Sequence, residues 1–189
     1  MAGPGFNGSI NVAAFECFAN LQAFSGTGLE SIGNYAFVGC TSLALTELPE
    51  GLTSIGLQAF SGCTSLSQIT LPAGLFSIGD WAFYGCTSLA LTELPAGLTS
   101  IGNYAFQGCT SLTQITLPVG FRVISICAFY GCTNLVLVIC HAVTPPIIAG
   151  NAFYDTHPNL EIKVPVASVT SYKVAPGWSE YAGRISAIE

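Results

Sequence analysis

Residues 77–89 read SIGDWAFYGCTSL, and close copies of this stretch begin at three other places in the chain. The copies are SIGNYAFVGCTSL from Ser31, SIGLQAFSGCTSL from Ser54 and SIGNYAFQGCTSL from Ser100, which gives a period of 23 residues. A fixed period of this length is typical of a solenoid, in which each repeat forms one coil and buries its apolar side only against its neighbours. We therefore expect the 189 residues to form one continuous domain.

The apolar residues between two copies predict how a coil is built. Leu66, Ile69, Leu71, Leu75 and Ile78 are spaced by 3, 2, 4 and 3 residues, which matches neither a helix nor a long strand. The step from Ile69 to Leu71 fits one short strand with both side chains inward. The equivalent strands, expected to pair in one parallel sheet, are residues 46–48, 69–71, 92–94, 115–117 and 138–140.

An Ala-Phe pair follows each Ser-Ile-Gly and predicts a short helical or 3₁₀ turn on the back of the coil. Together with L-x-x-I-x-L in the copies, this is the pattern of a leucine-rich repeat. We expect an α/β repeat solenoid, a right-handed leucine-rich-repeat superhelix of about six coils. It would have short parallel strands on one face, short helical turns on the other, and a C-terminal helical cap.

The repeats alternate between two versions, so the duplicated unit is 46 residues long. Copies one and three continue SLALTELP, whereas copies two and four continue SLSQITLP and SLTQITLP. If all copies keep one register, Thr46 and Thr92 take the inward position of Ile69. Leu45 and Leu91 would then point outward.

Two surfaces are candidate binding sites, because a solenoid offers an extended and regular surface. The outward strand positions form a mixed acidic, amide and aliphatic strip, which consists of Leu45, Glu47, Gln68, Thr70, Leu91, Glu93, Gln114 and Thr116. The back of the coils presents the aromatic residues Tyr35, Trp81, Tyr84, Tyr104 and Tyr130. These aromatic side chains suit either a protein or glycan ligand or packing between adjacent turns.

Charge is scarce and unevenly distributed, with 7% charged residues and a formal net charge of −6. Residues 1–121 contain six acids and no Lys or Arg, and all four basic residues lie in 122–189 with four acids. A protein that binds phosphates needs a basic stripe, so nucleic acid is excluded as a partner and an anionic membrane surface is disfavoured. The sequence has no apolar segment of membrane-spanning length and no secretory leader at its start, so no membrane insertion is expected.

Eight cysteines raise the question of disulfides or zinc. Five of them recur at one phase of the repeat: Cys40, Cys63, Cys86, Cys109 and Cys132. Side chains in such a column point the same way and cannot converge as tetrahedral zinc requires, so we expect reduced, buried thiols and no metal. Cys17, Cys127 and Cys140 lie off this column, and a bridge between Cys127 and Cys140 stays open.

The repeat loosens at both ends of the chain. Residues 1–30 are interpreted as a degenerate N-terminal capping coil, 31–141 as the regular repeats, and 142–189 as a last partial repeat with a C-terminal cap. Ser168 and Ser179 are predicted to cap the N-termini of two short helices, residues 169–175 and 180–185. Trp178 is expected to pack over the last coil.

The repeat unit L-x-x-I-x-L-P-x-x-L-x-x-I-G-x-x-A-F-x-x-C resembles the 23-residue BspA-like class of bacterial leucine-rich repeats. The tail, from ICHAVTPPIIAGNAF onward, is similar to the terminal segment of such proteins. The resemblance implies an extracellular or cell-surface bacterial protein whose array serves adhesion or recognition of host or microbial proteins. It carries over no catalytic residues, because the motif is structural.

The residues themselves also argue against catalysis. The sequence contains no nucleophile elbow, zinc-protease, P-loop or dinucleotide motif. Glu47 and Glu93 share a phase, but two coils place their backbones about 10 Å apart, where retaining-type cooperation of two carboxylates is disfavoured. We therefore expect a non-enzymatic monomer without cofactors that recognises a protein, with an inert structural spacer and a glycan-binding module as alternatives.

Overall fold

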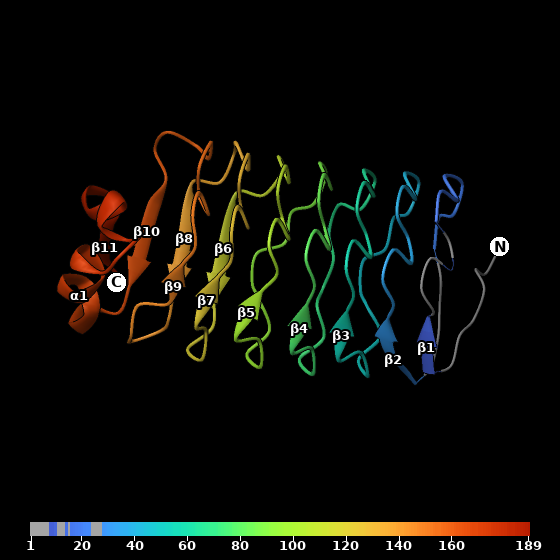
Figure 1. Cartoon of the computed structure of the whole chain (residues 1–189), viewed down its shortest axis with the longest axis horizontal. Helices are drawn as coiled ribbons and strands as arrows, with labels where there is room; N and C mark the ends of the chain where they lie inside the picture. Colours follow the sequence, from blue (N-terminus) through green and yellow to red (C-terminus); the bar gives the residue numbers. More distant parts are fainter. Residues whose placement is uncertain (1–7, 11–13, 15, 24–27) are drawn as a thin grey trace.

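The structure, a computed structural model, describes residues 8–10, 14, 16–23 and 28–189, which form a row of coils stacked along one axis (Figure 1). One column of short parallel strands, divided into two sheets, runs through seven coils of this part of the chain, one more than the six predicted. Its members are β1 (Gly8–Ile10), β2 (Leu29–Ile32), β3 (Ser54–Ile55) and β4 (Ser77–Ile78) in the first sheet, and β5 (Ser100–Ile101), β7 (Val123–Ile124) and β9 (Ile147–Ile148) in the second. The stacked repeat predicted from the period is confirmed as a parallel β-solenoid.

From β1 to β5 this first column is built from the Ser-Ile pair of the repeat, whereas β7 and β9 have Val-Ile and Ile-Ile in its place. The register joins Ser31 to Ser54 and Ile32 to Ile55, a step of one period, and the isoleucines are buried while the serines lie on the outer side. The sequence analysis assigned these isoleucines to the core but not to a strand. Two residues are too few to show the alternation that identifies a strand, and only pairing between coils creates it.

A second column contains β6 (Gln114–Leu117), β8 (Leu137–Cys140), β10 (Glu161–Val164) and β11 (Ile185–Ala187), all parallel neighbours. The predicted strands at 115–117 and 138–140 lie within β6 and β8. At 46–48, 69–71 and 92–94 no strand forms, and two isolated parallel bridges, Glu47 with Thr70 and Glu93 with Thr116, stand in their place.

The third side of each coil is a series of tight turns, in which amides such as that of Val38 bond to a carbonyl three residues back as in the predicted 3₁₀ alternative, but no helix forms in the turns that the structure describes. Tyr35 and Gly39 both have left-handed φ angles, 59° and 70°, which prevent a helix from propagating. Alternate amides instead bond to the next coil: the Tyr35 amide donates to the Leu57 carbonyl at 2.7 Å and the Phe37 amide to the Ala59 carbonyl at 2.8 Å. The turns therefore form a third ladder between coils.

Two columns of identical side chains fill the core behind these turns. The rings of Phe37, Phe60, Phe83, Phe106, Phe129 and Phe153 stack in sequence, with centroids 5.2 to 5.5 Å apart. Each column cysteine from Cys63 onward donates its thiol to the carbonyl of the Phe in the preceding coil, as in Cys86 to Phe60 at 3.0 Å. The predicted burial of the cysteine column is confirmed.

The alternation between repeat versions changes which residues point inward. Leu45 and Leu91 are buried, at 7% and 5% exposure, and Thr46 and Thr92 are exposed, so the single register predicted for all copies is wrong. In SLALTELP the leucine lies one position earlier than the isoleucine of SLSQITLP. The chain bends at Thr46 to put that leucine into the core, because burying an aliphatic side chain is favoured over burying a hydroxyl.

The C-terminal cap covers the last coil with three short helices: η1 (Val166–Ser168), α1 (Val169–Val174) and η2 (Ser179–Arg184). Trp178 and Tyr172 are fully buried, and they donate to the carbonyls of Pro146 and Ala142 at 2.6 and 2.7 Å. The predicted packing of Trp178 is therefore confirmed.

The predicted N-caps of these helices are wrong. Ser168 has αR geometry because η1 runs directly into α1, and its side chain makes no cap hydrogen bond. Ser179 is the first residue of η2 rather than its cap. Ile185, predicted as helical, begins β11, which pairs with β10 and adds a strand to the second column.

The predicted N-terminal cap, residues 1–30, lies partly outside the described residues. Its described part continues the stack, since β1 pairs with β2 and the Cys17 amide donates to the Val38 carbonyl at 2.7 Å. Among the residues that the structure describes, no helix is long and apolar enough to cross a membrane.

Candidate functional site

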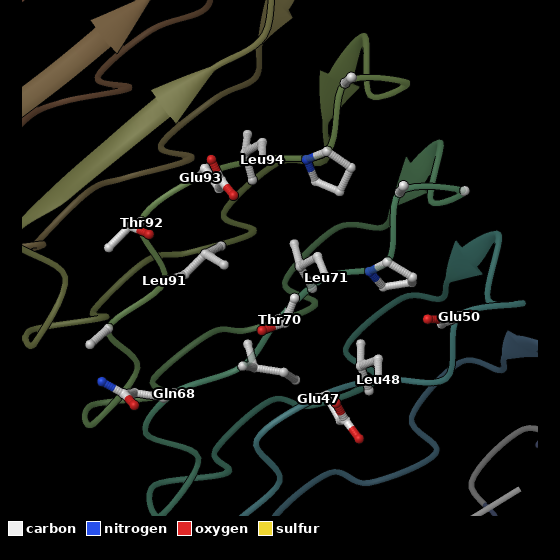
Figure 2. Close-up of a pocket in the computed structure, with 17 residues that line it drawn as sticks. Glu47, Leu48, Glu50, Gln68, Thr70, Leu71, Leu91, Thr92, Glu93 and Leu94 are labelled. Atoms are coloured by element: carbon white, nitrogen blue, oxygen red, sulfur yellow. The ribbon is translucent and has the colours of Figure 1, made fainter.

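A groove of about 1010 Å³ lies on the second strand side, over the coils where the sheet has not formed (Figure 2). It spans three successive coils. Its lining consists of Glu47, Leu48, Glu50, residues 68–74 and residues 90–96.

The groove coincides with a break in the hydrogen-bond ladder between coils. On one side of the break Thr70 donates its amide to the Thr46 carbonyl at 3.0 Å and accepts from the Leu48 amide at 3.2 Å. On the other side Thr116 makes the equivalent two bonds, both 2.9 Å, to Thr92 and Leu94. The segments 68–71 and 91–94 therefore each pair away from the other.

The peptide groups that face the break have no backbone partner. In the described part of the chain no backbone hydrogen bond joins 68–71 to 91–94, and the nearest bond between these two coils runs from the Ala90 amide to the Ser67 carbonyl at 2.6 Å. The unpaired peptide groups belong to Ile69, Leu71 and Glu93. A polar main chain in this state is satisfied by water or by a ligand.

The apolar floor of the groove is less completely covered than the same positions elsewhere. Ile69 and Leu71 are 5% and 8% exposed, whereas Ile115 and Leu117 in β6 are 0% exposed. The strand side thus has two halves, a closed sheet from β6 to β11 and an open groove over residues 47–96. We use the names closed half and groove for these two regions below.

The structure brings several residues of the predicted strip together at the groove. Glu47, Gln68, Thr70 and Glu93 are exposed and line it, and Thr70 lies between the two glutamates in Figure 2. Gln114 and Thr116 are half-buried in β6 and belong to the closed half.

Two members of the predicted strip are corrected. Leu45 is a core side chain, and Leu91, equally buried, lies in the floor of the groove rather than on its surface. The physical reason is the shift of the inward leucine in SLALTELP described above.

Glu50 was not predicted, yet it adds a third carboxylate to the groove lining. The equivalent residue two repeats later is Ala96, so no repeat pattern marks this position. With no Lys or Arg in residues 1–121, the groove is an anionic surface that favours cationic ligands.

The predicted aromatic surface on the turn side is largely engaged in stacking. Trp81 and Tyr104 stack at 4.8 Å with an interplanar angle of 8°, and both are half-buried. Tyr130 stacks on Tyr154 at 5.5 Å, a residue that the sequence analysis did not single out. Tyr35 is half-buried and Tyr84 is 42% exposed. Rings that cover each other's faces offer fewer free faces to a sugar, which weakens the glycan alternative.

The cysteines are free thiols, including Cys127 and Cys140, so the bridge left open between these two is not formed. Cys140 is buried with its sulfur 3.2 Å from the Tyr172 hydroxyl, whereas Cys127 is half-buried. Burial raises the pKa of Cys86 and of Cys132 to about 12. Within the described ranges no group of three His, Cys, Asp or Glu side chains could hold a metal ion.

We expect the thiols to divide into two classes in an alkylation experiment. Exposed Cys17 and half-buried Cys127 should react with iodoacetamide in the native protein at pH 8, and the five column cysteines should react only after unfolding. The thiolate is the nucleophile, and a raised pKa together with burial removes it from the column. Peptide mass mapping of native and denatured samples checks this, and native labelling of Cys86 would contradict it.

Comparison with known proteins places this architecture in a family. The model of the BspA type leucine-rich repeat region matches residues 8–136 in six copies. The chain belongs to the BspA-type leucine-rich-repeat family. No curated protein sequence matches this BspA-type chain at a significant level.

Two solved structures with TM-scores above 0.5 share the fold. A T. pallidum leucine-rich-repeat protein, TpLRR, is 25% identical with a TM-score of 0.59, and the match covers 94% of this BspA-type chain and 82% of that protein. The pneumococcal vaccine antigen PcpA is 16% identical with a TM-score of 0.64, and the match covers 94% of this chain and 42% of that protein. A leucine-rich-repeat protein from Bacteroides ovatus is 23% identical with a TM-score of 0.49, covering 96% of this chain and 64% of that one.

Proposed function

We propose that this BspA-type chain is a non-catalytic scaffold that recognises a protein through the groove on its strand side. The observation that carries the proposal is the open groove itself, where the ladder between coils stops and exposed polar residues surround a partly accessible apolar floor. A surface with a central apolar area and a polar rim is the usual anatomy of a protein-binding site.

The family supports an extracellular or cell-surface location for this scaffold. The repeat motif supplies only residues of the coil, such as the inward leucines, the Phe column and the Cys column. A repeat array of this kind gives a rigid support on which exposed residues vary. Protease treatment of intact cells of the source bacterium tests the location, because a surface protein is cleaved without lysis.

We expect the double variant E47K/E93K to lose ligand binding while it keeps its fold. Both side chains are exposed at the groove, so their replacement should change the free energy of unfolding by less than about 0.5 kcal/mol each. Reversing both charges should weaken binding of peptides selected by the unmodified protein from a phage-displayed random library by at least about tenfold. Biolayer interferometry and a thermal melt measure the two quantities.

The matched control is E30K/E180K, which makes the same change in net charge at exposed positions outside the groove lining. It should leave both binding and stability unchanged. If the library yields no enriched peptides, the protein-recognition proposal fails and the inert spacer is favoured. If instead W81A/Y104A abolishes binding and E47K/E93K does not, the site is the aromatic surface.

A further inference from the structure

We propose that the ligand of the groove is an extended peptide segment that carries lysine or arginine, and this proposal rests on the recognition function proposed above. The segment would lie with its main chain against the unpaired peptide groups of Ile69, Leu71 and Glu93. Its basic side chains would meet the carboxylates of Glu47 and Glu93. Both features come from the described residues, and each restricts the partner in a different way.

The break in the ladder selects an extended conformation. The unpaired groups belong to segments that are bridged on their other side, since Thr70 pairs with Glu47 and Glu93 with Thr116. They are thus held in a strand-like backbone, and the donors and acceptors of 68–71 and of 91–94 point toward each other across the break. An extended ligand that enters the break can bond to them through its main chain, which a helix cannot do because its own peptide groups are paired.

The charge of the groove selects a basic ligand. Glu47, Glu50 and Glu93 line the groove, and residues 1–121 supply no Lys or Arg to neutralise them. The closed half differs, because on β10 Lys163 lies 3.7 Å from Glu161 and the two charges are paired. An acidic segment would meet repulsion in the groove, and a neutral segment would gain nothing from the three carboxylates.

The floor of the groove sets a further condition on the ligand. Ile69, Leu71 and Leu91 keep only 5 to 8% of their surface exposed, which is too little for a deep side-chain pocket. The ligand therefore needs no large apolar anchor. Small or β-branched residues between the basic ones would fit a strand that lies over this floor.

The test uses the whole chain and a fluorescein-labelled peptide of about ten residues that alternates Lys and Thr, followed by fluorescence anisotropy. We expect measurable binding at about 50 mM NaCl, weakened at about 300 mM because screening shortens the range of the carboxylate charges. A Glu-Thr peptide of the same length should bind at least about tenfold more weakly. The variant E47Q/E93Q should weaken the Lys-Thr peptide about tenfold, and E30Q/E180Q, which removes the same charge outside the groove, by less than about twofold.

A second peptide tests the main-chain contacts. N-methylation of alternate residues removes amide donors while it keeps every charged side chain, so we expect a loss of at least about fivefold in affinity. Unchanged affinity would overturn the extended pairing.

Equal losses with E47Q/E93Q and E30Q/E180Q would show diffuse charge attraction and would overturn the site. The protein could also associate with itself as its concentration rises. If E47Q/E93Q abolished this self-association and the peptide did not, a second copy would be the occupant of the groove, and the peptide proposal would be overturned. If no basic peptide bound and the phage library yielded non-basic peptides instead, this ligand class would be rejected. The proposed recognition function would still hold.

Discussion

Replacing Phe83 by alanine is expected to lower the free energy of unfolding by about 3 to 5 kcal/mol, the usual cost of truncating a buried phenylalanine. Its ring is fully buried between those of Phe60 and Phe106, with centroids 5.4 and 5.3 Å away. The truncation therefore removes the stacking of Phe83 on the rings of both neighbouring coils, and it also removes the burial of its own ring. Because a solenoid coil is held only by its neighbours, the loss falls on two interfaces.

Urea denaturation of the reduced protein, followed by circular dichroism, measures this change. The matched control is Phe76→Ala in the same coil, since Phe76 is 60% exposed and outside the core. It should cost less than about 0.5 kcal/mol. Equal effects of the two substitutions would show that the Phe column does not hold the coils together.

The sequence could predict the stack, the Phe column and the Cys column, because each is a single residue type recurring at one phase. Any side chain at a fixed phase of a stacked repeat has the same environment in every coil. Burial of Phe83 in the third copy therefore follows from the repeat itself. Trp178 could be placed over the last coil for a related reason, since an open coil end needs an apolar cover.

The Ser-Ile strands and the form of the turns depend on contacts between coils, so they could not be predicted from the sequence of one repeat. The Ser-Ile strands are two residues long in most coils and exist through pairing with the next coil. The left-handed residue is Tyr35, Gln58, Trp81, Tyr104 or Cys127 in five successive turns, and none of these residues signals such a φ angle by its chemistry. Only Asn151, in the next turn, is of a type enriched in this conformation. The sequence therefore predicts a helical or 3₁₀ turn at this place.

The groove was predictable only in part. The exposed phase of Glu47 and Glu93 could be assigned from the pattern, and both line the groove. The break in the ladder could not, because the two repeat versions meet at every junction, yet bridges form between Glu47 and Thr70 and between Glu93 and Thr116. Glu50 follows a proline outside the strand pattern, so its place in the lining also depended on the three-dimensional arrangement.

Gly102→Ala is the second substitution for which we expect a large effect, a loss of about 3 kcal/mol, at the upper end of the cost of overpacking. A Cβ atom on Gly102 would clash with the Asp80 nitrogen and with the Gly79 carbonyl carbon, both in the backbone of the preceding coil. This backbone is fixed by bonds between the two coils, such as those from the Gly102 amide to the Ile78 carbonyl at 3.0 Å and from the Trp81 amide to the Asn103 carbonyl at 2.8 Å, so it cannot retreat as a flexible side chain could. The added methyl group would also disturb the 2.6 Å bond from the Asn103 amide to the Asp80 carboxylate.

The next coil shows what relieving this contact requires. Ser125 occupies the position of Gly102 there, and the equivalent bond, from the Ile126 amide to the Asn103 side-chain oxygen, is longer at 3.2 Å. At Ser125, where the chain carries a side chain, this bond is thus longer than the bond that Asp80 accepts beside Gly102. The control Gly120→Ala, with no atom within 4 Å of its added Cβ, should range from no effect to a gain of about 1 kcal/mol. If urea denaturation gave Gly102→Ala the same stability as this control, close approach of the coils would not explain the glycine in the repeat.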